Sequence, residues 1–295
     1  MSTQKTVGTG LKSVMAALGG ALVLLGAFAP LDEAAAQVKN TRHNLGSGSA
    51  ATNNRFSGTD EVCVFCHTPH GSATGAGAPP LWNKGTPAGP YQVYNTSSSS
   101  TIDGVLATDG IAGSPGIGSV SIACLSCHDG TQAMNNMINQ PGSGGYTAAG
   151  ASMAGAWTAG GTATTSVTAA GLLNVGIGNL SADLRNDHPI GIQYCGGGFT
   201  TLAAAGTCGD GDFIAPISAV IGSSRVFWVE TGGNTNRNKT DMILYNRSFG
   251  GANPEPAVEC ATCHDPHIQD VAGSNPTFLR KANTASQVCL ACHVK

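Results

Sequence analysis

The sequence predicts a mostly irregular, loop-rich fold with a few short helices and one β-hairpin, and three observations predict it. Glycine accounts for 42 of the 295 residues. Aromatic residues make up only 5% and charged residues only 11% of the chain, so few large side chains are available for a conventional apolar core. The third observation is a Cys-x-x-Cys-His motif that occurs four times, at residues 63–67, 124–128, 260–264 and 289–293.

Each of these motifs has the chemistry of covalent haem attachment. Two thiols one helical turn apart can each add across a vinyl group of one porphyrin, and the following His then binds the iron. The 10 Cys and 8 His of the chain would give about 0.01 copies by chance. A structural zinc site is the alternative, but zinc needs no His after the second Cys. The motifs predict four covalently attached haem c groups, held by the thiols of Cys63, Cys66, Cys124, Cys127, Cys260, Cys263, Cys289 and Cys292 and ligated by His67, His128, His264 and His293.

The fold is therefore expected to be organised around four porphyrins, which supply apolar surface that the side chains lack. A short helix is expected from Thr284 into the last motif, and another from Ala123 toward Ile138. Residues 225–230 and 242–246 predict the two strands of a hairpin.

Residues 141–178 are rich in Gly, Ala, Thr and Ser, and two interpretations stay open for them. They form either a flexible insertion or a surface flap that packs over haem edges. Trp157 favours partial packing.

The four histidines outside the motifs, His43, His70, His188 and His267, match the number of free axial positions. Four irons have eight axial positions and the chain has 8 His, so bis-His ligation of every iron is expected. His70 and His267 each follow a motif His by three residues, a spacing that lets two imidazoles serve neighbouring haems. With every iron saturated, we expect an electron carrier with no catalytic residue. The alternatives are a surface role for a lone His, or a methionine ligand from Met134, Met137, Met153 and Met242.

The first 36 residues are typical of a secretory signal peptide. Lys5 and Lys12 precede an apolar run from about Val14 to Ala29, and a small-residue cleavage site follows at residues 34–36. The run is short for a membrane anchor, and no second stretch is long enough to cross a bilayer. We expect an exported chain, extracellular, at the cell surface or periplasmic, in which residues 37–295 form one domain.

Two cysteines, Cys195 and Cys208, lie outside the motifs. Export favours their pairing, and we predict a disulfide between them; free thiols or a metal site are the alternatives.

The formal charge of −3 excludes a strongly basic surface and argues against nucleic acid as a partner. Two propionates on each haem would take the charge to about −11. The candidate partners of these propionates are Arg42, Arg185, Arg247 and Arg280.

At its motifs the chain resembles a known family, the tetrahaem OmcE-like cytochromes that polymerise into extracellular filaments. The resemblance rests on His43-Asn-Leu, on Cys-Val-Phe-Cys-His-Thr-Pro-His from residue 63, on Pro-Leu-Trp-Asn from residue 80, on Cys-Leu-Ser-Cys-His-Asp-Gly-Thr from residue 124, on Asp-His-Pro from residue 187, and on Cys-Ala-Thr-Cys-His-Asp-Pro-His from residue 260. It covers the haem ligands and is absent from the Gly-rich middle.

This resemblance implies bis-His haems stacked in one chain and a head-to-tail homopolymer. It also implies that each protomer passes a distal His to a haem of its neighbour, and His43, on an N-terminal arm with few intramolecular ties, is the matching residue. Other redox proteins or extracellular electron acceptors are the remaining expected partners. The alternatives are a monomeric periplasmic or surface shuttle, with His43 folded back onto its own chain, and a multihaem reductase with one open haem.

Overall fold

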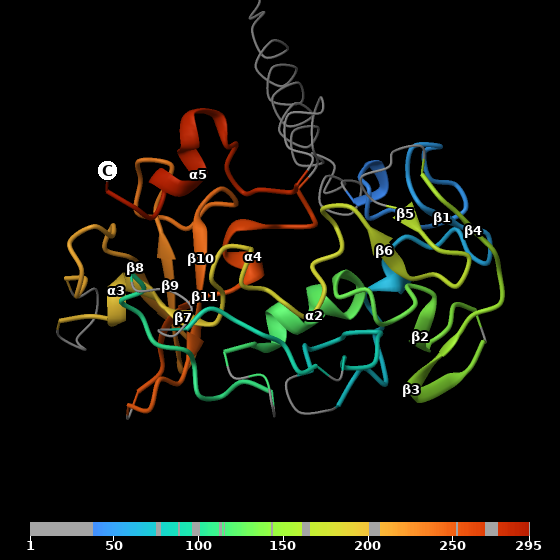
Figure 1. The fold of residues 1–295 in the computed structure, drawn as a ribbon, viewed down its shortest axis with the longest axis horizontal. Coiled ribbons are helices and arrows are strands. Elements are labelled where there is room, and N and C mark those ends of the chain that lie inside the picture. Colours follow the sequence, from blue (N-terminus) through green and yellow to red (C-terminus); the bar gives the residue numbers. More distant parts are fainter. Residues whose placement is uncertain are drawn as a thin grey trace, which may run out of the picture. The chain divides into compact units, whose positions relative to one another are not determined.

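The largest regular element of the computed structural model is a five-stranded antiparallel sheet (Figure 1). The structure describes residues 38–74, 78–87, 89–95, 101–111, 114, 116–142, 144–160, 166–200, 207–251, 253–268 and 277–294. The predicted signal peptide, residues 1–36, lies outside them. The strands of the sheet follow one another in the order β7 (Ile192–Gln193), β11 (Glu255–Val258), β10 (Met242–Arg247), β9 (Ser224–Val229) and β8 (Ile217–Ile221).

The pairing of β9 with β10 confirms the predicted hairpin. Met242 lies opposite Val229 and Leu244 opposite Phe227. Strand β8 extends this hairpin through a two-residue turn, because Ile221 pairs with Ser224.

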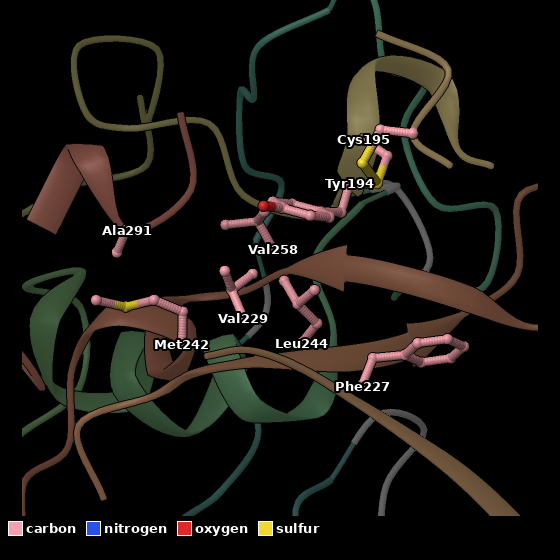
Figure 2. Packing of buried hydrophobic residues seen from close by; sticks show 9 residues of the cluster. Tyr194, Cys195, Phe227, Val229, Met242, Leu244, Val258 and Ala291 are labelled. Atoms are coloured by element: carbon pink, nitrogen blue, oxygen red, sulfur yellow. A yellow bond between two sulfur atoms is a disulfide. The ribbon is translucent and has the colours of Figure 1, made fainter. Parts of the chain in front are cut away.

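Side chains of this sheet build one of the apolar clusters (Figure 2). Val229 and Met242 are fully buried, and Tyr194 from the short helix α3 (Tyr194–Gly197) packs with them. Cys263 and Cys292, from two different haem motifs, contact the same cluster. The sheet therefore supports the third and fourth motifs.

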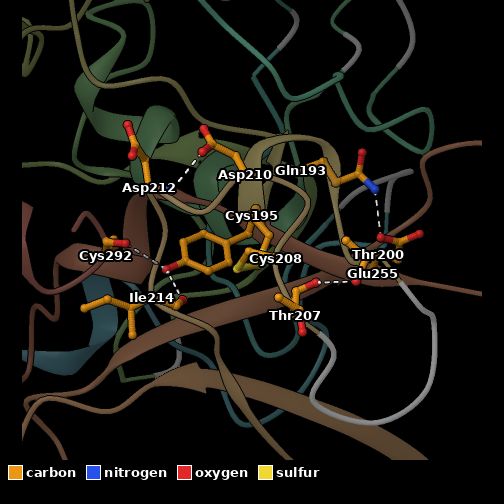
Figure 3. The surroundings of a disulfide bond; sticks show 11 residues. Gln193, Cys195, Thr200, Thr207, Cys208, Asp210, Asp212, Ile214, Glu255 and Cys292 are labelled. Atoms are coloured by element: carbon orange, nitrogen blue, oxygen red, sulfur yellow. Dashed lines mark hydrogen bonds between the residues drawn. A yellow bond between two sulfur atoms is a disulfide. The ribbon is translucent and has the colours of Figure 1, made fainter. Parts of the chain in front are cut away.

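The predicted disulfide between Cys195 and Cys208 is present in the structure (Figure 3). It closes a loop with a sequence separation of 13. The loop is fastened to the fourth motif, because the hydroxyl of Tyr194 donates to the carbonyl oxygens of Ile214 (2.9 Å) and Cys292 (3.3 Å).

The helix expected from Ala123 toward Ile138 is wrong at both ends. Helix α2 spans Ser119–His128, and the strand β2 (Asn136–Asn139) follows it. The Asp129–Gly130 turn explains where the helix ends. Gly130 has a φ of +74°, which glycine adopts without strain, and the carboxylate of Asp129 accepts a hydrogen bond from the Thr131 N–H at 2.8 Å.

The helical segment predicted before the last motif is confirmed as two short turns, η3 (Thr284–Ser286) and α5 (Gln287–Leu290). Three further short helices are η1 (Val38–Asn40), η2 (Cys63–Phe65) and α4 (Cys260–Cys263). None of the helices in the described part of the chain has the length and apolar character needed to cross a membrane.

The described residues of the Gly-rich segment 141–178 include the strands β3 (Tyr146–Ser152), β4 (Trp157–Thr158), β5 (Ser166–Val167) and β6 (Leu173–Val175). Strand β3 pairs with β2, β5 pairs with β6, and β4 pairs with β1 (Arg55–Phe56).

The packing expected of Trp157 is confirmed. Its ring centre lies 5.1 Å from that of Phe56 and 6.4 Å from that of Phe65, which belongs to the first motif. Its indole N–H donates to Asn135 Oδ1 at 3.1 Å. Trp157 and the buried Val167 of β5 therefore pack against the first motif as part of a flap would, whereas strand β3 is mostly exposed.

Replacing both disulfide cysteines, Cys195→Ala with Cys208→Ala, is expected to lower the free energy of unfolding by about 3 kcal/mol, because the unfolded chain regains the entropy of a loop of this length. Chemical denaturation followed by circular dichroism measures it. The control Thr200→Ala removes only an exposed hydrogen bond of the same loop. A loss in the double variant no larger than in this control would contradict the prediction.

Candidate haem sites

A helical turn carries each of the four Cys-x-x-Cys-His motifs. The first lies on η2, the second on the last turn of α2, the third on α4 and the fourth on α5 and the residues after it. The N–H groups of His67, His264 and His293 donate to the carbonyl of the first Cys of their own motifs, at 2.8, 3.1 and 3.0 Å. Such a turn brings both thiols and the imidazole to one side of the backbone, as attachment to one porphyrin requires.

None of the eight motif cysteines forms a disulfide bond. Successive motifs lie near each other. Cys66 and Cys127 pack against the same apolar cluster, and helix α2, which ends in the second motif, contacts α4, which carries the third. Cys263 and Cys292, from the third and fourth motifs, likewise pack against one apolar cluster. The four motifs therefore form a row in sequence order.

Burial keeps several of these thiols protonated. It raises the pKa of Cys66 and of Cys292 to about 12, and the pKa of Cys263 to about 11.

Two motif histidines are oriented by backbone carbonyls. His128 Nδ1 lies 2.6 Å from the carbonyl oxygen of Gly178, and His264 Nδ1 lies 2.5 Å from that of Thr277. A carbonyl only accepts, so Nδ1 carries the proton and Nε2 keeps its lone pair for a metal. Metal-bound histidines are held in this way, and the donor set therefore fits a haem iron.

Two histidines outside the motifs face motif histidines. The ring centre of His43 lies 6.0 Å from that of His128, and the ring centre of His267 lies 6.1 Å from that of His67. Imidazole–metal bonds are about 2 Å long, so two imidazoles on opposite sides of one iron have ring centres about 6 Å apart. Both pairs have the separation that one iron between them requires.

The surroundings of three of these four rings favour the neutral imidazole that binds a metal, whereas the hydrogen bond with Asp265 raises the pKa of His267. Burial lowers the pKa of His43 to about 3 and also lowers the pKa of His67 and His128. His267 Nδ1 lies 3.2 Å from Asp265 Oδ1. This carboxylate orients the ring and leaves Nε2 facing away from it.

The expectation that His43 lies on an arm with few intramolecular ties is wrong. The side-chain amide of Asn53 donates to the carbonyl of Thr41 at 2.8 Å, and that of Asn44 donates to the carbonyl of Lys39 at 2.7 Å. Leu45 is buried in an apolar cluster with Phe56 and Phe65. The side chains on both sides of His43 therefore fasten it to its own chain.

The structure leaves His70 and His188 apart from the motif histidines. Both are exposed, and no ring contact among the described residues joins either of them to another histidine. His188 Nδ1 lies 2.9 Å from the carbonyl of Pro189, whereas Asp187, beside it, makes no hydrogen bond to the ring.

Asn83 holds the first motif in place, a role that the sequence analysis did not predict. It is fully buried. Its N–H donates to the carbonyl of Cys66 at 2.9 Å, and its side chain donates to those of Val64 (2.7 Å) and Asn139 (2.8 Å). The only sequence signal was its place in the Pro-Leu-Trp-Asn string.

A buried ion pair joins the second motif to the third. Glu259, only 2% exposed, binds the guanidinium of Arg247 and the hydroxyl of Ser121 in α2. The Ser121 hydroxyl also accepts a hydrogen bond from the Cys260 N–H at 3.2 Å. Burial raises the pKa of Glu259.

Three of the four arginines expected to meet haem propionates already have protein carboxylates as partners. Arg247 binds Asp109 at 2.8 Å as well as Glu259. The remaining pairs are Arg185 with Asp183 at 2.7 Å and Arg280 with Asp265 at 3.2 Å.

Comparison with known proteins bears on the C-terminal part of the chain. A family model for the doubled CXXCH motif matches residues 254–295, which contain the third and fourth motifs. A search of curated proteins finds no match. The doubled motif indicates a multihaem c-type cytochrome, which binds haem covalently, transfers electrons and is exported from the cytoplasm.

Glu259→Gln is expected to lower the free energy of unfolding by about 3 kcal/mol, because a buried arginine loses one of its charged partners. Denaturation of the haem-loaded protein measures this loss. The matched control is Asp183→Asn, which breaks an exposed ion pair and is expected to cost much less, because solvent screens exposed charges. Equal losses in the two variants would contradict the importance of the buried pair.

Proposed function

We propose that this protein moves electrons through four covalently attached haems held in one domain, residues 37–295, after removal of a signal peptide. The observation that carries the proposal is the row of four motifs, in which successive motifs share an apolar cluster or a helix contact. Porphyrins attached along such a row would have neighbouring edges. Each haem, when bound, accepts and releases one electron at its iron.

The protein side chains hold and shield these groups. The two His–His separations support His43 as the distal ligand opposite His128, and His267 as the distal ligand opposite His67. His70 and His188 remain for the irons of His264 and His293. Eight histidines then saturate four irons, so substrate has no open position at a metal, and we propose that the protein is not an enzyme.

The resemblance at the motifs supports a finer proposal, in which the protein is the protomer of an extracellular head-to-tail filament. A heterologous contact of this kind produces open polymers. Because His43 is fastened beside His128 of its own chain, the exposed His70 and His188 are the better candidates for ligating a haem of the neighbouring copy.

The monomeric shuttle is the second candidate, and the position of His43 favours it. A chain that supplies its own distal ligand to the second haem needs no neighbour there. Cryo-electron microscopy of the secreted protein at neutral pH separates the two. Filaments with four haems in each repeat support the polymer, and discrete single protomers support the shuttle.

His267→Ala and His43→Ala are each expected to keep four covalent haems while one iron loses its distal ligand. The resting ferric protein then gains a high-spin signal in electron paramagnetic resonance, because a five-coordinate iron has a weaker ligand field. Mass spectrometry counts the haems in each variant. Lys39→Ala, which changes an exposed side chain of the same segment, is the control. A purely low-spin spectrum in both histidine variants would refute the assigned pairs.

A further inference from the structure

Lys84 is a buried cation that the proposed haem ligation does not use. Its side chain has 0% exposure. The ammonium donates to the carbonyl oxygens of Met134 at 2.7 Å and Asn136 at 3.0 Å. Two neutral carbonyls disperse the charge without cancelling it.

The position of Lys84 is at the junction of the first and second motifs. Its neighbour in sequence, Asn83, binds the backbone of Val64 and Cys66 in the first motif. The Met134 side chain packs in one apolar cluster with Cys66 and Cys127. The charge of Lys84 also opposes the rise in the pKa of both thiols that burial causes.

Lys84 differs from two buried arginines near the other motifs. Arg247, between the second and third motifs, has ion pairs with Asp109 and Glu259, and Arg280, beside the third, has one with Asp265. Within the described ranges, no carboxylate forms an ion pair with Lys84.

One further charged group faces the same junction. Asp129 acts on the Cys127 thiol with the opposite sign to Lys84. Its carboxylate accepts hydrogen bonds from the Tyr91 hydroxyl at 2.6 Å and from Thr131. Asp129 is thus tied to other groups and does not pair with Lys84.

We propose that Lys84 is a fixed positive charge that raises the reduction potentials of the haems attached through Cys66 and Cys127. The inference rests on the proposed attachment of haems at these motifs. One electron converts ferric to ferrous haem and lowers the net charge of the site by one, so a nearby cation favours the reduced form. Burial keeps the cation from being screened by solvent or salt.

The first two haems are therefore better electron acceptors than they would be without the charge of Lys84. At a protein-like effective dielectric, removing one buried charge near a haem shifts its reduction equilibrium about tenfold, which is about 59 mV for one electron.

Spectroelectrochemical titration of the four-haem protein tests the proposal with Lys84→Met, Lys84→Gln and Lys84→Arg. The two neutral variants are expected to move two of the four reduction steps to lower potential by about this tenfold shift. Lys84→Arg, which keeps the charge, is expected to titrate like the unaltered protein. Lys84→Gln keeps an N–H donor and decides the outcome if Lys84→Met does not fold.

The matched control is Lys239→Met, which removes an exposed positive charge and is expected to leave all four steps unchanged at high salt. Unchanged potentials in the neutral variants would overturn the proposal. Equal shifts in the neutral variants and in Lys84→Arg would also overturn it, because they would report lost hydrogen bonds and not lost charge. Absence of haem at residues 63–67 or 124–128 of the unaltered protein, seen by peptide mass spectrometry, would instead refute the proposed function.

Discussion

The contact between α2 and α4 through the buried carboxylate of Glu259 is the constraint on which the row of motifs depends. The second motif ends α2 and the third lies on α4, so the distance between their thiols is set where these helices meet. Glu259 binds Ser121 on one side and Arg247 on the other, and the Ser121 hydroxyl accepts from the N–H of Cys260. A buried charged network has few alternative geometries, because any displacement leaves a desolvated charge without its partner.

Outside the five-stranded sheet, side-chain amides form many of the hydrogen bonds that hold the loops together. A loop-rich chain still has to satisfy its buried backbone groups, and here asparagines supply many of the partners. Asn83 joins the first motif to Asn139 of β2, and Asn53 holds the segment that carries His43. Asn135 links the carbonyl of Met153 with the indole of Trp157. The apolar clusters are correspondingly small, and motif cysteines contact two of them.

Charge is distributed unevenly along the row. Arg247 and Arg280 lie against carboxylates, whereas Lys84 lies only against carbonyl groups. Iron centres with the same ligands are distinguished by the charge and burial around them. In the proposed set of bis-His haems, buried side chains that contact no iron would therefore give the haems different reduction potentials.

The features that depend on residues close together in sequence were predictable from the sequence. Each of these features is short. A stretch of about twenty residues is enough to contain any one motif, the β9–β10 hairpin, the final helical segment or the Cys195–Cys208 pair. The end of α2 was missed because the Asp129–Gly130 turn overrides the apolar pattern that continues to Ile138.

Strands β7, β8 and β11 were missed as well. They are short, and β7 gains its place only by pairing with β11, which lies far along the chain.

By itself, the sequence determined which residues can carry haem, since thiol and imidazole chemistry follows from residue type and spacing. Only the tertiary structure decided which histidines face each other, because His43 and His128, or His67 and His267, are far apart in sequence. It also decided the burial of Lys84 and of the Glu259 carboxylate. Burial and long-range proximity come from the packing of distant segments, and no local pattern encodes them.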